Sequence, residues 1–99
     1  MAEEVLPLIG ARDYPAFRKL MPEELPATYR GWLECCHRKE IAERQRKGLT
    51  VREIPVHLDD FRGWLRDTGK PASVQALWHC AVHVADRDYR QSQPPDSAR

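Results

Sequence analysis

This sequence of 99 residues has no apolar run that approaches the roughly 20 residues needed to cross a bilayer. Its first residues, MAEEVLPLI, are acidic and then interrupted by Pro7, so they lack the basic start and the unbroken apolar stretch of a secretion signal. It has only three cysteines, an odd number that cannot pair completely within one chain. We therefore expect a cytoplasmic protein with free thiols that makes no contact with a membrane.

The sequence also lacks an excess of charge of either sign, with 16 basic and 15 acidic residues. Nucleic-acid-binding proteins normally carry clustered positive charge. Here the one basic concentration is the segment from Arg38 to Lys47, in which glutamates interrupt the lysines and arginines. That pattern favours a solvated helix face over a nucleic-acid interface.

Familiar catalytic motifs are missing as well. There is no C-x-x-C or H-E-x-x-H pattern, and the five glycines are too scattered to form a phosphate-binding loop. Asp59 and Asp60 are better explained by the favourable interaction of acidic residues with a helix N-terminus than by acid–base catalysis. We therefore expect no enzyme, no catalytic residue and no cofactor.

The turn and capping residues predict a mainly α protein, a small bundle of three to four helices with one short extended segment at about residues 50–56. A single helical domain is expected over residues 13–90, preceded by an extended arm (1–12) and followed by a disordered tail (91–99). The expected helices are a short one after the N-cap Asp13, one from Pro26 to about Lys47 closed by Gly48, one after Asp59 closed by Gly69, and one from about Ser73 to Arg90.

The helix expected between residues 26 and 47 changes character along its length. Its first half carries an apolar stripe at helical spacing, formed by Tyr29, Trp32, Leu33 and Cys36. After Cys36 the stripe weakens, because Glu40 occupies its next position and Ile41 lies away from it. The second half is supported by charge pairs four residues apart, expected between Glu34 and Arg38, Glu40 and Arg44, and Glu43 and Lys47.

The segment TVREIPV, Thr50 to Val56, is β-branched and predicts a strand, which Pro55 restricts to the edge of a sheet. A lone strand leaves its backbone groups unpaired, so it needs a partner strand. The N-terminal segment EEVLPLI and the same strand of a second subunit are both candidates. The second possibility is the main reason to expect a homodimer.

The segment LWHCAVH carries His79 and His83, four residues apart on one helix face, where both could reach a divalent ion. On a helical wheel the core stripe consists of Val74, Leu77, Trp78, Ala81 and Ala85, and the two histidines lie opposite it. A structural zinc site needs four ligands, and the other two would have to come from elsewhere. We expect solvated histidines and no metal site, with metal-dependent assembly through His79 and His83 as an alternative.

The cysteines are expected to be inert. Cys36 and Cys80 lie at or beside core faces, and Cys35 is exposed in mid-helix without a helix N-terminus to stabilise a thiolate. Trp32, Trp64 and Trp78 each lie on an apolar stripe and are expected to anchor the core. A tryptophan that proved exposed would instead mark a partner-binding patch.

The two helices around Gly69 also allow a helix-turn-helix reading. A helix that reads DNA bases should present Arg, Lys, Asn or Gln near its N-terminus. This one offers only Lys70, Ser73 and Gln75 before it becomes apolar. A helix pair that builds the core is favoured, and a nucleic-acid-binding regulator using this pair and the basic segment Arg38 to Lys47 is the alternative.

Two stretches, ELPATYRGWL (24–33) and GLTVREIPVHLDDFRGWLRDTGKPAS (48–73), resemble a family of short uncharacterised bacterial proteins. Its pattern is a helix opening with Pro-x-Thr-Tyr-x-x-Trp-Leu, a β-branched segment and a helix rich in acidic and aromatic residues. The resemblance implies no activity and no site residue. From the sequence we thus expect a non-catalytic protein-interaction or regulatory module, homodimeric, whose partner is another protein or itself.

Overall fold

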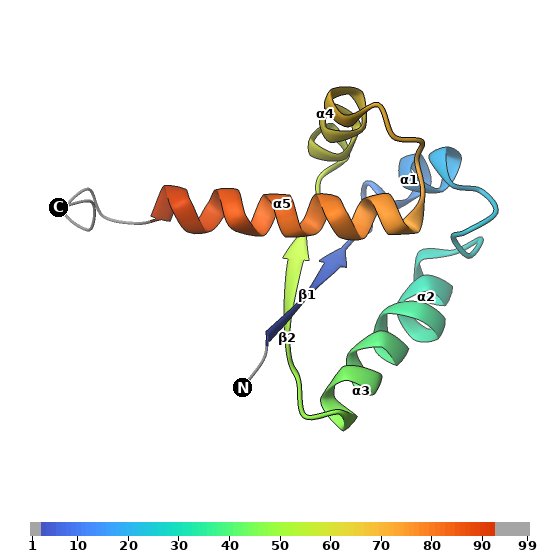
Figure 1. Ribbon diagram of the computed structural model, residues 1–99. Helices are drawn as coiled ribbons and strands as arrows, with labels where there is room; N and C mark the ends of the chain where they lie inside the picture. The colour runs from blue at the N-terminus through green and yellow to red at the C-terminus, as the bar shows by residue number, and fades with distance from the viewer. Residues whose placement is uncertain (1–2, 93–99) are drawn as a thin grey trace, which may run out of the picture.

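The computed structural model of this protein describes residues 3–92, with side chains to residue 89. Its elements in chain order are β1 (Glu3–Leu8), α1 (Tyr14–Leu20), α2 (Tyr29–Trp32), the π-helical segment η1 (Leu33–His37), α3 (Arg38–Arg46), β2 (Thr50–Pro55), α4 (Leu58–Thr68) and α5 (Val74–Ser92). The fold is mainly helical, as predicted, but it also contains a two-stranded sheet. In Figure 1, α5 crosses both strands, and α2 and α3 lie beside the sheet, below α5.

β1 and β2 pair in parallel, with Glu3 opposite Thr50 and Leu8 opposite Pro55. The strand predicted near residues 50–56 therefore has its partner in the same chain. The segment expected to be an extended arm is extended, and its side chains at Leu6 and Ile9 are buried in the core. The unpaired strand that suggested a homodimer is thus explained within one chain, and the homodimer stays a prediction.

The centre of the core is formed by Phe17 of α1 and Phe61 of α4, whose rings stack with centroids 5.5 Å apart. Both rings are fully buried. Side chains from both strands and most of the helices surround them, among them Ile9, Tyr14, Met21, Leu25, Ile54, Val56, Leu77, Ala81 and Val84. The prediction that three tryptophans anchor the core is wrong for two of them. Only Trp32 is buried, whereas Trp64 and Trp78 are half-buried at its border.

α2, η1 and α3 follow one another without a break and together form the central helix, Tyr29–Arg46. This helix begins later than predicted. Thr28 caps it, because its side-chain oxygen accepts a hydrogen bond from the Gly31 N–H at 3.0 Å. The helix therefore starts at Tyr29, not at Pro26. Gly48, at φ 81°, takes the left-handed conformation just after α3 ends, as the sequence predicts for a helix-ending glycine.

η1 interrupts the α-helical pattern within this central helix. The Arg38 N–H donates to the carbonyl of Leu33, five residues earlier, which is the hydrogen bond of a π-helix. Residues four apart across this turn no longer lie one above the other. Accordingly, Glu34 pairs with Arg30 at 3.2 Å and the predicted pair with Arg38 is not formed. The other two predicted pairs, Glu40 with Arg44 and Glu43 with Lys47, are present.

α4 ends at Gly69, which is left-handed at φ 70°, and α5 follows after a short turn. The predicted core stripe of α5 is partly confirmed. Leu77, Ala81 and Ala85 are buried, but Val74 and Trp78 are only half-buried, and Cys80 and Val84 are buried as well. The core-facing stripe is therefore rotated toward Cys80.

α5 ends at Ser92, two residues beyond the predicted end, so residues 91 and 92 of the expected tail are helical. Residues 93–99, the rest of that tail, lie outside the described residues. Among the residues that the structure describes, no helix combines the length and the apolar character needed to cross a membrane.

Candidate functional site

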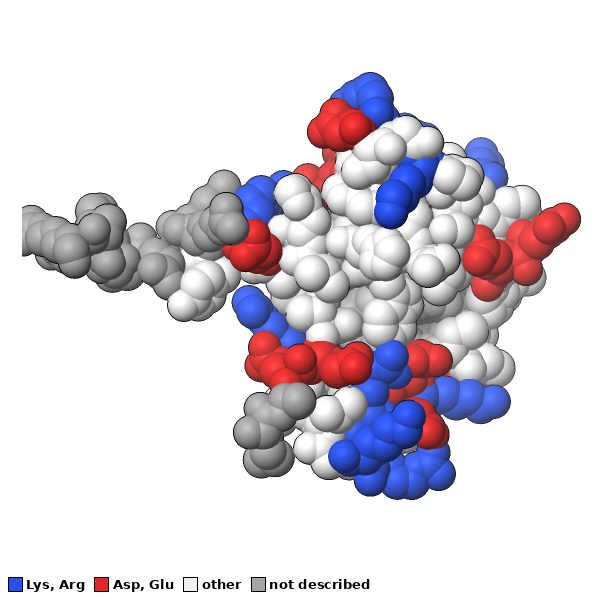
Figure 2. Space-filling view, in the orientation of Figure 1, with Lys and Arg blue, Asp and Glu red and all other residues white. Residues whose placement is uncertain are grey.

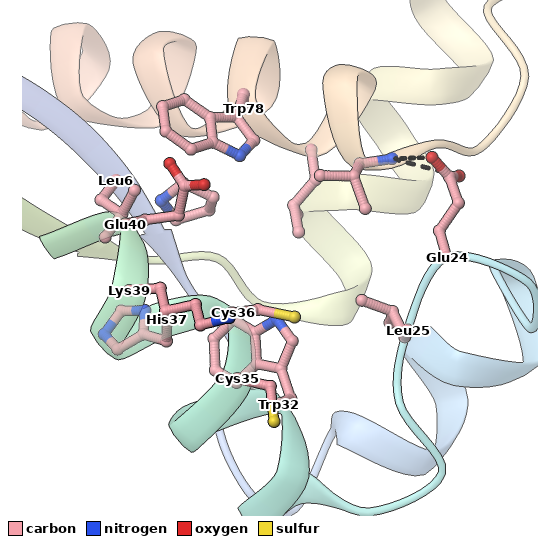
Figure 3. A pocket seen from close by; sticks show the side chains of 13 residues that line it. Leu6, Glu24, Leu25, Trp32, Cys35, Cys36, His37, Lys39, Glu40 and Trp78 are labelled. Atoms are coloured by element: carbon pink, nitrogen blue, oxygen red, sulfur yellow. Dashed lines mark hydrogen bonds between the residues drawn. The ribbon is translucent and has the colours of Figure 1, made fainter. Parts of the chain in front are cut away.

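A cavity of about 270 Å³ opens between the central helix and α5. Such a volume is large for a single side-chain pocket, since a dry protein cavity of about 150 Å³ already holds benzene. β1 contributes to its lining through Leu6 and Pro7, and the loop before α2 contributes Glu24 and Leu25. The remaining lining residues are Trp32, Cys35, Cys36, His37, Lys39, Glu40, Val74, Leu77 and Trp78. The cavity therefore lies where the central helix, β1 and α5 meet (Figure 3).

Two indole rings lie on opposite sides of this cavity. Trp32 comes from α2 and is 6% exposed, and Trp78 comes from α5 and is half-buried. Figure 3 shows the ring nitrogens of both turned toward the cavity. Neither indole N–H has a hydrogen-bond partner among the described residues, although a buried tryptophan N–H usually has one. The sequence predicts that an exposed tryptophan would mark a partner-binding patch, but Trp78, like Trp64, is half-buried, so that condition is not met.

The Cys36 thiol also points into the cavity, whereas the Cys35 sulfur points away from it (Figure 3). Burial raises the pKa of the Cys36 thiol, and the neighbouring Cys35 and Glu40 raise it further. A catalytic cysteine needs the opposite shift, because the thiolate is the nucleophile. Cys36 is therefore a protonated, weakly polar part of the wall at neutral pH.

Among the residues whose burial the structure describes (3–89), His37 is the one buried residue with a polar side chain outside the apolar core set, at 6% exposure. Its Nε2 lies 2.5 Å from Glu53 Oε1 of β2, and its ring stacks on Trp32 with centroids 5.0 Å apart. In Figure 3 its imidazole lies on the far side of the central helix from the cavity. His37 thus fastens η1 to the sheet and holds the Trp32 ring in place.

Arg44 does not line the cavity but contacts two residues that do, Glu40 and Trp78. Its guanidinium lies over the Trp78 ring, 4.4 Å from the centroid, and its Nε donates to Glu4 Oε2 of β1 at 3.0 Å. It also donates to the Glu40 carboxylate. Burial alone would lower the pKa of Arg44, but the hydrogen bonds with Glu40 and Glu4 raise it above its usual value. This cation ties α3 to both β1 and α5.

A second, open groove of about 500 Å³ lies between α3 and α5. Glu40, Val74 and Trp78 line both the cavity and the groove. Val82 on the rim of the groove is 54% exposed. In Figure 2, uncharged side chains fill the middle of this face, and charged ones gather along its lower border.

The histidines singled out in the sequence do not form a metal centre within this chain. His79 and His83 are both exposed, as predicted. Among the residues that the structure describes, no three His, Cys, Asp or Glu side chains are close enough together to hold an ion. His79 instead packs edge-on against Trp64, with ring centroids 6.4 Å apart. Metal-dependent assembly would need ligands from another molecule.

The features that suggested nucleic-acid binding are largely engaged elsewhere. Arg44 is held by Glu4 and Glu40, while Arg46 and Lys47 pair with Glu43. In the turn around Gly69, the Lys70 ammonium lies over the Trp64 ring, 5.6 Å from its centroid. The groove between α3 and α5 is nevertheless shared by the two features, because Arg44 of the basic segment and Gln75 of the helix pair both line it.

The cavity itself was not predicted from the sequence. Its polar neighbours His37 and Glu53 gave no pattern, because they are 16 residues apart and meet only through the strand pairing. In comparisons with known proteins, no family model, no curated protein and no solved structure matches this chain. Inference about its function therefore rests on the geometry of the cavity and the groove.

Proposed function

We propose that this protein is a non-catalytic interaction module that binds an apolar segment of a partner protein between α5 and the central helix. The observation that carries the proposal is that the cavity and the groove share three lining residues, Glu40, Val74 and Trp78, and so lie side by side. A large side chain of the partner would fill the cavity, and its neighbours would lie along the groove beside Val82. Burial of one aromatic or aliphatic anchor in a pocket is the usual source of affinity in such interfaces.

The dimensions favour a polypeptide over a small molecule. Pockets for small molecules usually measure about 300–1,000 Å³ and enclose most of the ligand. This cavity, at about 270 Å³, is slightly smaller, and the adjoining groove is open along α5. A chain segment can use both parts together, because one side chain enters the cavity while the backbone follows the groove.

The polar groups of the cavity support a binding role and give no reason to propose a reaction. The Cys36 thiol has a raised pKa, so it is a poor nucleophile. The His37 imidazole is bonded to Glu53 on the other side of the helix and is not available as a base in the cavity. Three unpaired thiols fit a reducing compartment, so we place the protein in the cytoplasm as part of the proposal.

Selection from a displayed library of random peptides tests this function directly. We expect the selected peptides to share one large apolar residue and to lose at least tenfold in affinity for the Val82→Glu variant. Val82 is exposed, so this change should leave folding intact. Ala11→Glu is the matched control, because Ala11 is an exposed apolar residue in a turn that lines neither the cavity nor the groove. Peptides whose binding is the same for all three proteins would refute the proposal.

A further inference from the structure

The side-chain polar groups that open to the cavity without a partner are hydrogen-bond donors. The indole N–H groups of Trp32 and Trp78 point into it and have no acceptor among the described residues. Trp32 is the stronger case, because its side chain is almost entirely buried and lines the cavity. Lys39, an exposed cation on the rim, makes no ion pair with a described residue.

The acceptors in the lining are already engaged. The Glu40 carboxylate is paired with Arg44, which also pairs with Glu4. Both oxygens of Glu24 lie 3.3 Å from the Val74 N–H at the start of α5. His37 is bonded to Glu53 outside the cavity. What remains unpaired in the lining are the two indole donors and the Lys39 ammonium, beside the engaged carboxylates of Glu24 and Glu40.

We infer that the bound segment carries a carboxylate, an Asp or Glu side chain, next to its large apolar anchor. The apolar group fills the cavity, and the carboxylate accepts hydrogen bonds from the two indole N–H groups and pairs with the Lys39 ammonium. This inference deepens the proposed function and rests on it. The cost of leaving buried donors unpaired disfavours an anchor without an acceptor, so the carboxylate adds specificity as well as affinity.

Three small probes share one phenyl group and differ in their polar end, which is a carboxylate, a hydroxyl or an ammonium group. They are 4-phenylbutyrate, 4-phenylbutanol and 4-phenylbutylamine. Their binding is followed by ¹H–¹⁵N NMR of the three indole N–H signals. Trp64 is an internal control, because it does not line the cavity. We expect 4-phenylbutyrate to shift the signals of Trp32 and Trp78 but not that of Trp64, and to bind at least tenfold more tightly than the amine.

Lys39→Gln should lower the affinity for 4-phenylbutyrate roughly two- to fivefold, the range typical of an exposed ion pair, and leave the alcohol unaffected. If the three probes bind equally well, the carboxylate inference is overturned while the apolar pocket of the proposed function stands. If none of them moves the Trp32 or Trp78 signals, both the inference and the pocket fail.

A second set of binding measurements, with peptides, tests whether the bound carboxylate belongs to a polypeptide side chain or to a free carboxylic acid. A peptide with blocked ends that contains a Leu-Glu pair is compared with its Leu-Gln counterpart and with 4-phenylbutyrate. We expect the Leu-Glu peptide to bind most tightly, and Val82→Glu to weaken the peptide at least fivefold while leaving 4-phenylbutyrate unchanged, since only the peptide reaches the groove. If the small acid binds as tightly as the peptide and Val82→Glu affects neither, the ligand is a free carboxylic acid and the partner segment is refuted.

Discussion

Replacing Phe61 by alanine should remove a large part of the stability of this protein. The Phe61 ring is fully buried and stacks on Phe17 with centroids 5.5 Å apart. Truncating such a ring to alanine costs about 3–5 kcal/mol, because it removes the transfer free energy of the ring and leaves a cavity. A domain of this length has a total free energy of unfolding of about 5–15 kcal/mol. With a urea m-value of about 2 kcal/mol/M, the unfolding midpoint should fall by about 1.5–2.5 M.

Trp78→Ala is the control variant for the Phe61→Ala measurement. Trp78 is larger than Phe61, but it is only half-buried and faces the cavity on one side. Losing part of its buried area and its contact with the Arg44 guanidinium should cost about 1–2 kcal/mol. Urea unfolding followed by circular dichroism measures both variants. A midpoint that falls as far for Trp78→Ala as for Phe61→Ala would show that the core is centred on the tryptophans after all.

Four further predictions follow from local features. Gly69→Ala should lower the free energy of unfolding by about 1–2 kcal/mol in a thermal melt, because the left-handed φ of 70° disfavours any residue with a Cβ. At pH 8 an aromatic disulfide reagent should modify Cys35 in the native protein and Cys80 only after unfolding, because burial and the nearby Asp60 raise the pKa of the Cys80 thiol to about 11 and leave it protonated. In a gel-shift assay at 150 mM salt we expect no retention of duplex DNA, because three of the five basic side chains between residues 38 and 47 are paired with glutamates. Zinc should leave the melting temperature unchanged, and the double variant His79→Ala, His83→Ala should behave like the unmodified protein.

The helices were predictable where the sequence contains a local stop or start. Gly48 and Gly69 end α3 and α4 because only glycine takes the left-handed conformation there without strain. Start positions were less certain, since Pro26 and Thr28 are both acceptable near a helix N-terminus and the capping hydrogen bond of Thr28 decides between them. The sequence predicts burial of all three tryptophans because each lies on an apolar stripe, but such a stripe does not show which of its rings reach the core. A large ring at the edge of an apolar stripe can remain partly exposed, as Trp78 does.

The two strand prolines explain why the sheet stops at two strands. In a parallel ladder, successive residues of a strand turn their N–H groups alternately toward and away from the neighbouring strand. The Val56 N–H donates to the Leu8 carbonyl, so Pro55 faces the outer edge of β2 and, by the same alternation, Pro7 faces the outer edge of β1. Neither proline costs a ladder bond, and each removes a donor from an open edge, which discourages pairing with another strand. The sequence placed Pro55 at an edge, but only the register shows that both edges are protected.

The candidate site was hidden from the sequence by the single π turn. The α-helical spacing of Tyr29, Trp32 and Cys36 predicts Glu40 as the next buried position, and on that basis Ile41 appeared to leave the stripe. The extra residue in η1 shifts the stripe by one position, so that His37 and Ile41, four residues apart, continue it. His37 then turns toward Glu53, and the Cys36 thiol is left facing the cavity. The one-residue displacement of Ile41 from the stripe was thus the sequence feature that indicated the π turn. The π turn places the Cys36 thiol, and not His37, on the side of the helix that faces the cavity beside Trp32.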